Sequence, residues 1–183
     1  SLTAYGLYVY DFKLKKAAFT FVMAILVMPT QVTAMGFLRL ITKMGMYDSL
    51  LPLIIPSIAS PAVFYFMYSY LQSSLPLSLV EAARIDGMKE KQIYSRIILP
   101  LAKPAFITLG IYHFMNNWND LIYPMMLTSS VEKRTLSAGL AILVGSNSIK
   151  YGPTLAATVI SIAPLMILFL FCQRFFMEGI ATS

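Results

Sequence analysis

The sequence predicts an all-α integral membrane protein, with four kinked transmembrane helices and a helix-turn-helix segment between two of them. Of the 183 residues, 58% are hydrophobic and only 12% are charged, about half the charged fraction of an ordinary soluble domain. The charges are separated by long windows that hold none or one. This composition excludes a disordered chain and disfavours a soluble enzyme, which needs more polar groups to cover its surface.

Four windows are long enough to cross a bilayer core, which takes about 20 apolar residues in a helix. Residues 17–38, 49–80 and 151–173 hold no charged residue, and residues 104–131 hold only Asp120. Their apolar runs do not alternate as the strands of a membrane barrel would, and hydrocarbon admits only helices and closed barrels. We therefore expect spans at the ranges listed here: 17–38, 50–72, 104–127 and 154–174.

Prolines interrupt the expected spans, and each removes a backbone hydrogen-bond donor. They are Pro29, Pro56, Pro61, Pro124 and Pro164. Membrane helices tolerate such residues when neighbouring groups satisfy the freed carbonyls. We therefore expect a kinked bundle, which suits a transporter but occurs in most proteins with several spans.

The charges between the spans predict the orientation of the chain. Four spans place residues 1–16, 81–103 and the C-terminal end on one face, with nine of the 14 basic residues. Residues 39–48 and 132–150 fall on the other face with five. The positive-inside rule makes the first face cytoplasmic. A nucleic-acid-binding surface is disfavoured, because the basic residues are split between two faces.

The beginning of the sequence predicts a fragment. There is no initiator Met and no signal-peptide pattern, and residues 1–10 are apolar but too short to span. We expect these residues to be the last turns of a helix whose beginning is missing.

The cytoplasmic segment predicts two short helices joined by a sharp turn. Ser78 and Glu81 have the spacing of a capping box, so a helix is expected over residues 79–86. Gly87 is placed to end that helix in the left-handed conformation. A second helix is expected over residues 89–99, because a proline follows it.

The first of these helices carries two alanines, Ala82 and Ala83, flanked by Glu81, Arg84 and Asp86. Small side chains allow close approach to another protein, and charges pair at the rim of such an interface. A plain interfacial helix-turn-helix with no partner fits the same residues. On these observations alone, both interpretations remain open.

The spacing of this segment resembles the cytoplasmic signature of permease subunits of ABC importers. That signature is E-A-A, three residues, G, nine residues, then I-x-L-P. It is present here as Glu81-Ala82-Ala83, Gly87, Ile97, Leu99 and Pro100. The resemblance is to the carbohydrate-uptake, maltose-transporter-like group, and it extends over nearly the whole chain. It includes residues 117–124 and 173–181.

The resemblance implies a single, partial transmembrane domain over residues 1–183, with a cytoplasmic coupling segment at 78–100. Since the family has six spans, the first and most of the second would be missing. It implies the cell membrane of a prokaryote as the location. The implied partners are cytoplasmic ATPase subunits that hold ATP and Mg²⁺, a second and homologous permease subunit, and an extracytoplasmic solute-binding protein. The chain itself would carry no catalytic residue, metal or cofactor.

The resemblance also implies roles for the coupling residues. Glu81 would pair with a basic residue of the ATPase, Ala82 and Ala83 would allow close docking, and Gly87 would make the turn. Arg84 and Asp86 complete the expected coupling site.

A second candidate site is the polar run within the third expected span. Amides, a carboxylate and an aromatic face suit hydrogen bonding and stacking with a sugar, and a carboxylate near the bilayer usually faces a cavity or a partner. A polar cluster that holds helices together is the alternative. The expected solute-path residues are Asn116, Asn117, Trp118, Asn119, Asp120 and Tyr123.

Other functions are disfavoured by what the sequence contains. A proton-driven carrier or channel needs a chain of ionisable groups in the membrane, and only Asp120 and His113 are available. An intramembrane enzyme needs paired carboxylates or a nucleophile with its base. A structural membrane protein would leave the cytoplasmic signature unexplained. An importer for glycerol phosphate or another solute remains the alternative to a sugar importer.

Overall fold

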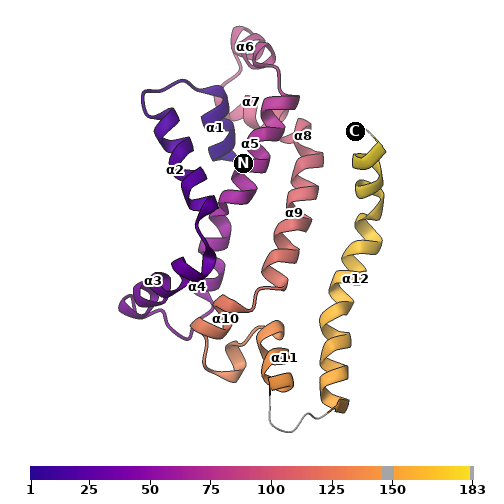
Figure 1. Ribbon diagram of the computed structural model, residues 1–183. Coiled ribbons are helices and arrows are strands. Elements are labelled where there is room, and N and C mark those ends of the chain that lie inside the picture. The colour runs from indigo at the N-terminus through magenta and orange to yellow at the C-terminus, as the bar shows by residue number, and fades with distance from the viewer. Residues whose placement is uncertain (146–150, 182–183) are drawn as a thin grey trace. The chain divides into compact units, whose positions relative to one another are not determined.

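The computed structural model describes residues 1–145 and 151–181, with residues 173–181 as backbone only. Every regular element in these residues is helical, as predicted (Figure 1). The elements form two compact units. Unit 1 is Ser1–Val27 with Ala59–Gly110, and unit 2 is Met28–Ile58 with Ile111–Ser183.

Unit 1 is built on a central helix, α5 (Pro61–Ser74), against which α1 (Leu2–Val9) and α2 (Lys15–Val27) pack (Figure 1). The hydroxyl of Tyr8 on α1 donates to the carbonyl of Leu75 at 2.9 Å, which ties the two helices together. The remaining elements of the unit are α6 (Leu77–Ile85), α7 (Glu90–Ile93), η2 (Tyr94–Ile98), α8 (Leu99–Leu101) and the first part of α9 (Lys103–Trp118).

One apolar core lies within unit 1 and receives side chains from α1, α5, α6 and the segments up to α9. Its best-buried large members are Met67, Leu71, Leu75, Ile93 and Ile98. Burying such side chains is the main favourable contribution to packing within the unit. This core fixes α6 and α7 against the ends of α1 and α5.

Prolines lie at the starts of the helical segments that lead into α5. α4 (Leu51–Ile54) is followed by the short 3₁₀ helix η1 (Pro56–Ala59). α5 then starts with Pro61 at its first position, and the Ser60 hydroxyl accepts from the backbone N–H of Val63 at 3.4 Å. Proline is favoured at the first position of a helix, where its missing N–H would have no partner.

The second helix of the helix-turn-helix differs from the prediction. It does not end before Pro100: α7 widens into the π-helical turn η2, and α8 continues through Pro100 to Leu101. The N–H of Leu99 reaches back to the carbonyl of Tyr94. Pro100 then lies in the first turn of α8, where a missing N–H costs little, so the wider turn removes the conflict that the prediction assumed.

Unit 2 contains α3 (Thr30–Lys43), α4, α10 (Ile122–Leu127), η3 (Val131–Lys133), α11 (Leu136–Gly145) and α12 (Tyr151–Ala181). α10 packs against α3 and α4, and α11 packs against α12. The rings of Phe37 and Tyr123 meet edge to face at 5.7 Å. Helix α11 lies within residues 132–150, which the sequence placed between two expected spans without predicting a helix.

Two helical stretches are long and apolar enough to cross a membrane, Leu51–Ser74 and Tyr151–Cys172, within the residues that the structure describes. The number rises to four if each of two bent pairs is one span. The bends lie between α2 and α3, where Pro29 excludes the preceding residue from helical geometry, and between α8 and α9. The last two expected spans thus differ in outcome: 154–174 lies within α12, whereas 104–127 is not one helix, because α9 ends at Trp118.

Candidate functional site

Helix α6 begins two residues earlier than predicted, at Leu77. Pro76 is its N-cap, with extended backbone angles and no side-chain cap hydrogen bond. The N–H of Leu79 already bonds the Pro76 carbonyl at 3.1 Å. Ser78 therefore lies inside the helix, where it cannot act as the N-cap, and the predicted capping box with Glu81 is wrong. The fixed φ of proline preorganises this start.

The end of α6 is as predicted. Gly87 has φ +77°, its N–H bonds the carbonyl of Arg84 at 3.0 Å, and the N–H of Met88 bonds the carbonyl of Ala83 at 3.0 Å. This pair of bonds is a Schellman motif, which satisfies carbonyls that the helix end leaves free. A Cβ at Gly87 would meet no atom within 4 Å, so backbone conformation alone requires glycine here.

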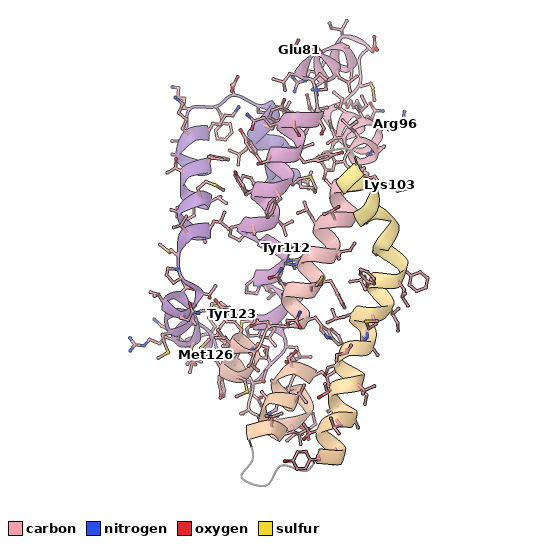
Figure 2. The ribbon with its side chains drawn as sticks, turned by 45° about the vertical axis from the view of Figure 1, so that its right-hand side comes forward. Glu81, Arg96, Lys103, Tyr112, Tyr123 and Met126 are labelled. Carbon is pink, nitrogen blue, oxygen red and sulfur yellow. The ribbon has the colours of Figure 1, made fainter. Side chains whose placement is uncertain are left out.

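The outward face of α6 is a stripe at helical spacing, formed by Ser78, Glu81, Ala82 and Ile85, all of them exposed. Figure 2 shows Glu81 on α6 at the upper end of unit 1. Ile85 is 86% exposed, the highest value among the large apolar residues that the structure describes. Sequence reasoning missed Ile85, although its spacing of four residues from Glu81 places both on one face.

The inward face of α6 is formed by Val80 and Ala83, which are 1% and 5% exposed. Both belong to the core of unit 1. The two alanines, which the sequence expected to dock a partner together, differ in burial: Ala83 contacts the core of its own unit and Ala82 is exposed, since adjacent residues of a helix point about 100° apart. The small side chain of Ala83 lets α6 pack closely against its own unit. The small side chain of Ala82 adds little bulk to the outward stripe.

Arg84 is held within the unit. Its Nε donates to Oε1 of Glu90 at 2.7 Å, and its guanidinium lies 5.5 Å from the centre of the Tyr10 ring. The hydrogen bond from Arg84 lowers the pKa of the Glu90 carboxyl, and the same bond raises the pKa of Arg84. Asp86, at the C-cap of α6, is exposed.

The polar run at the end of α9 is folded back on its own helix. The side-chain amides of Asn116, Asn117 and Asn119 each donate to the carbonyl four residues earlier, at 2.8, 2.8 and 2.9 Å. Such bonds compete with the helical ladder, and α9 ends at Trp118. The three asparagines are nevertheless exposed. They lie at the end of the helix and in the connection after it, not inside a continuous span as predicted.

Trp118 and Asp120 have structural partners in unit 2. The indole N–H of Trp118 donates to the carbonyl of Ser161 on α12 at 3.1 Å, and the Ser137 hydroxyl donates to the Trp118 carbonyl at 2.5 Å. Oδ1 of Asp120 accepts from the N–H of Ile122 at 3.1 Å, at the start of α10. Tyr123 on α10 is half-buried, and its ring packs against that of Phe37. Trp118 thus fits the alternative of a helix-linking polar group.

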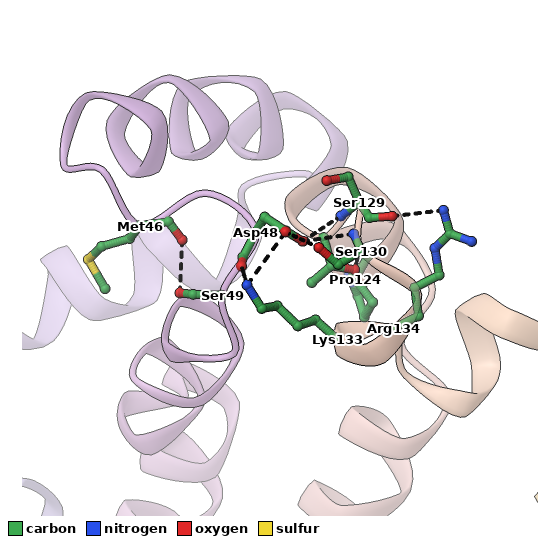
Figure 3. A network of polar contacts seen from close by, with 9 residues as sticks. Met46, Asp48, Ser49, Pro124, Ser129, Ser130, Lys133 and Arg134 are labelled. Carbon is green, nitrogen blue, oxygen red and sulfur yellow. Dashed lines mark hydrogen bonds and ion pairs between the residues drawn. The ribbon is translucent and has the colours of Figure 1, made fainter.

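A polar network around Asp48 was not anticipated from the sequence (Figure 3). Its Oδ1 accepts from the backbone N–H groups of Ser129 and Ser130 at 2.8 and 2.9 Å, and Oδ2 accepts from the Ser130 hydroxyl. Nζ of Lys133 lies 3.5 Å from Oδ2. The hydroxyl and N–H groups of Ser130, with the N–H of Ser129 and the charge of Lys133, hold the pKa of Asp48 well below its usual range.

Asp48 also has an unusual backbone. Its φ is +55°, a conformation that aspartate tolerates better than most residues, and its N–H bonds the carbonyl of Leu127 at 2.9 Å. The network therefore ties the connection before α4 to the segment after α10. The only sequence signal was a lone aspartate between two apolar windows.

Comparison with known proteins identifies the family to which the chain belongs. The model of the family described as "Binding-protein-dependent transport system inner membrane component" matches residues 1–181. The chain belongs to this family. Family membership confirms the resemblance to importer permeases and makes the chain part of an inner membrane component.

Two relatives of this inner membrane component are named as permease proteins of transport systems. It is 36% identical, over all of its 183 residues, to the arabinooligosaccharides transport system permease protein AraQ of Bacillus subtilis (strain 168), and covers 65% of that protein. It is 29% identical to the sn-glycerol-3-phosphate transport system permease protein UgpE of Yersinia enterocolitica, covering all of this chain and 65% of the relative. The chain thus spans about two thirds of the length of these relatives.

A solved structure has the same fold. It is the crystal structure of a bacterial ABC transporter involved in the import of the acidic polysaccharide alginate, with a TM-score of 0.80 and 23% identity. The match covers 95% of this inner membrane component and 66% of the other chain.

Proposed function

We propose that the protein is a membrane-embedded permease subunit of an ATP-driven importer, in which it forms half of the pore. The observation that carries this proposal is the outward stripe of α6, formed by Ser78, Glu81, Ala82 and Ile85. This face of a short helix carries an acidic side chain, a small one and a large exposed apolar one. Such a face suits insertion into a cleft with a basic rim. The spacing of the signature around Gly87 supports the same role.

On this proposal, the chain catalyses no covalent step. ATP and Mg²⁺ bind to the partner ATPase, which grips the outward stripe. Closure of the ATPase moves α6, and the pore alternates between two accessible states by a rigid-body movement. Glu81 pairs with a basic residue of the ATPase, and Ile85 fills an apolar pocket beside it. A second permease subunit completes the pore, and an external binding protein delivers the solute.

Co-purification tests the coupling role. The full-length permease, with its sister subunit, is expected to retain the ATPase on an affinity column. Glu81→Lys is expected to abolish solute uptake while the protein still inserts in the membrane. Normal uptake by Glu81→Lys, or absence of any ATPase from the purified complex, would contradict the proposal.

We further propose that residues 81–103 face the cytoplasm. Cys172 is the one cysteine of these 183 residues, so single cysteines can be placed in a background in which Cys172 and any cysteine outside these residues are replaced by serine. Ile85→Cys is expected to react with a membrane-impermeant maleimide only in inside-out vesicles. Reaction in right-side-out vesicles would overturn the topology.

The solute proposed is a sugar, on the strength of the similarity to AraQ. The similarity to UgpE supports glycerol 3-phosphate as the alternative. Asn116 and Asn119 are exposed, lie one turn apart near the end of α9, and carry amides suited to hydroxyl groups. Binding of labelled arabinooligosaccharide and glycerol 3-phosphate to the cognate binding protein distinguishes the two solutes. Asn119→Leu is expected to raise the KM of uptake if α9 contacts the solute.

A further inference from the structure

A hydrogen-bonded cluster connects α6 to α1 within unit 1. The carboxylate of Glu90, at the start of α7, accepts from three side chains. Nε of Arg84 on α6 lies 2.7 Å from Oε1, while the hydroxyls of Tyr10 and Tyr5 lie 2.5 and 3.2 Å from Oε2. The Arg84 guanidinium also lies over the Tyr10 ring at 5.5 Å. Two segments that are distant in sequence, residues 5–10 and 84–90, thus meet at one carboxylate.

Helix α6 has few other attachments that resist rotation. It gives two small or medium side chains, Val80 and Ala83, to the core. Its two ends are Pro76, in extended conformation, and Gly87, at φ +77°. Both connections are short, residues 75–76 before the helix and 86–89 after it, and a short helix can pivot about such connections when a force acts on its outer face. The Arg84–Glu90 bond lies off the helix axis and opposes that rotation.

The receiving side of the cluster is closely packed. Tyr5 is buried in the core of unit 1 and its ring packs against those of Tyr10 and Tyr94, at 6.1 and 5.4 Å. Helix α1 in turn packs along α5. A displacement of Glu90 is therefore passed to the two helices at the centre of the unit.

We propose that Arg84, Glu90, Tyr10 and Tyr5 form a joint that transmits the movement of α6 to α1 and α5. This inference rests on the proposed function, since it assumes that a partner moves α6. Arg84 and Glu90 act here as positioning residues, because neither lies on the outward stripe. The joint differs from the docking contact: Glu81 and Ile85 receive the force, and Glu90 distributes it.

The interactions of the joint fix the orientation of the Arg84 side chain more than they stabilise the fold. The side chains of Arg84 and Glu90 are 38% and 45% exposed, and exposed ion pairs contribute little to folding. A guanidinium bound to a carboxylate and stacked on a ring nevertheless holds a defined orientation. Loss of the joint should therefore leave the fold and the docking surface intact while force transmission fails.

The test uses the complete transporter reconstituted in lipid vesicles. Glu90→Gln and Tyr10→Phe are expected to retain the ATPase on the affinity column and to leave basal ATP hydrolysis unchanged. The amount of solute taken up per ATP hydrolysed is expected to fall about fivefold or more. The double variant Arg84→Glu with Glu90→Arg is expected to regain most of this ratio. Lys91→Gln, which removes a charge from the neighbouring exposed residue, is the matched control and is expected to behave as wild type.

A second readout follows the helix directly. Spin labels at Leu79→Cys, an exposed position of α6 outside the outward stripe, and at Leu14→Cys, in the Cys172→Ser background, report the distance from α6 to the exposed connection after α1. Glu90→Gln is expected to broaden that distance distribution, whereas Lys91→Gln is not.

The outcomes separate the joint from the proposed function. If Glu81→Lys uncouples transport but Glu90→Gln keeps both the uptake ratio and the narrow distance distribution, the joint is wrong and the proposed function stands. A charge-swapped double variant no better than the single variants also overturns the joint. If the wild-type complex retains no ATPase, both inferences fail together.

Discussion

The indole N–H of Trp118 is hydrogen-bonded to the backbone carbonyl of Ser161, with 3.1 Å between nitrogen and oxygen. The partner carbonyl lies three residues before Pro164, the proline inside α12. A proline within a helix removes one donor and displaces the preceding turn, which turns carbonyls outward. The two residues thereby link the end of α9 to the middle of α12 within unit 2.

Removal of this bond should weaken unit 2. Trp118→Phe keeps an aromatic ring for the stacking on Phe114, whose ring centre is 5.5 Å away, and deletes only the donor. The expected loss is about 1 kcal/mol of stability, typical of one hydrogen bond, measured by thermal denaturation in detergent. Phe114→Leu keeps the indole and serves as the control that loses stacking alone. Unchanged denaturation of Trp118→Phe would show that this bond does not stabilise unit 2.

The turn at Gly87 should tolerate only residues that accept positive φ. Gly87→Val places a β-branched side chain in the left-handed region, at a cost of about 1–2 kcal/mol, although no atom lies within 4 Å of the new Cβ. Solute uptake is therefore expected to fall severalfold. Gly87→Asn has similar bulk but favours that region, and it should retain most uptake. Equal loss in both variants would point to space, not backbone angle, as the constraint.

The outward stripe should depend on Ile85 as an apolar contact. Ile85→Asp is expected to abolish retention of the ATPase on an affinity column, because a carboxylate would be desolvated in the partner's pocket. Leu14→Asp changes another exposed apolar residue, at 69% exposure, in the connection after α1 and outside the expected spans, and is the matched control. Retention of the ATPase by Ile85→Asp would place the contact elsewhere on the helix.

The Asp48 network should give a pH-dependent stability. A carboxyl whose pKa is lower in the folded than in the unfolded chain stabilises the fold above the unfolded pKa, about 3.9 for aspartate. That contribution is lost as the pH falls through the folded-state pKa. The hydroxyl and N–H groups of Ser130, with those of the neighbouring residues, lower the pKa of Asp48.

Asp48→Asn tests this dependence, since asparagine keeps the size and tolerates the φ of +55°. The variant is expected to denature at a lower temperature than wild type between pH 5 and pH 8, with a constant gap. The gap should close progressively below about pH 4. Thermal denaturation in detergent across this range measures it, and a gap that persists unchanged to pH 3 would argue against the network.

Local patterns were sufficient for part of the structure. Long windows without charge leave a chain no stable choice but helices that satisfy their own backbone groups, and every described element is helical. The left-handed turn at Gly87 also followed from local spacing, because a helix end depends on the few residues beside it. The spacing of the signature from Glu81 to Pro100 was sufficient to indicate the family.

Tertiary structure decided which faces and partners those elements have. Only packing against the core of unit 1 shows that Ala83 turns inward while Ile85 turns outward. Tyr5 and Glu90 are 85 residues apart in the chain, and Asp48 and Ser130 are 82 apart. Such contacts depend on how whole segments come together and not on the sequence near either residue. Local spacing predicts a helix and its end, whereas the meeting of distant segments creates the joint at Glu90 and the network at Asp48.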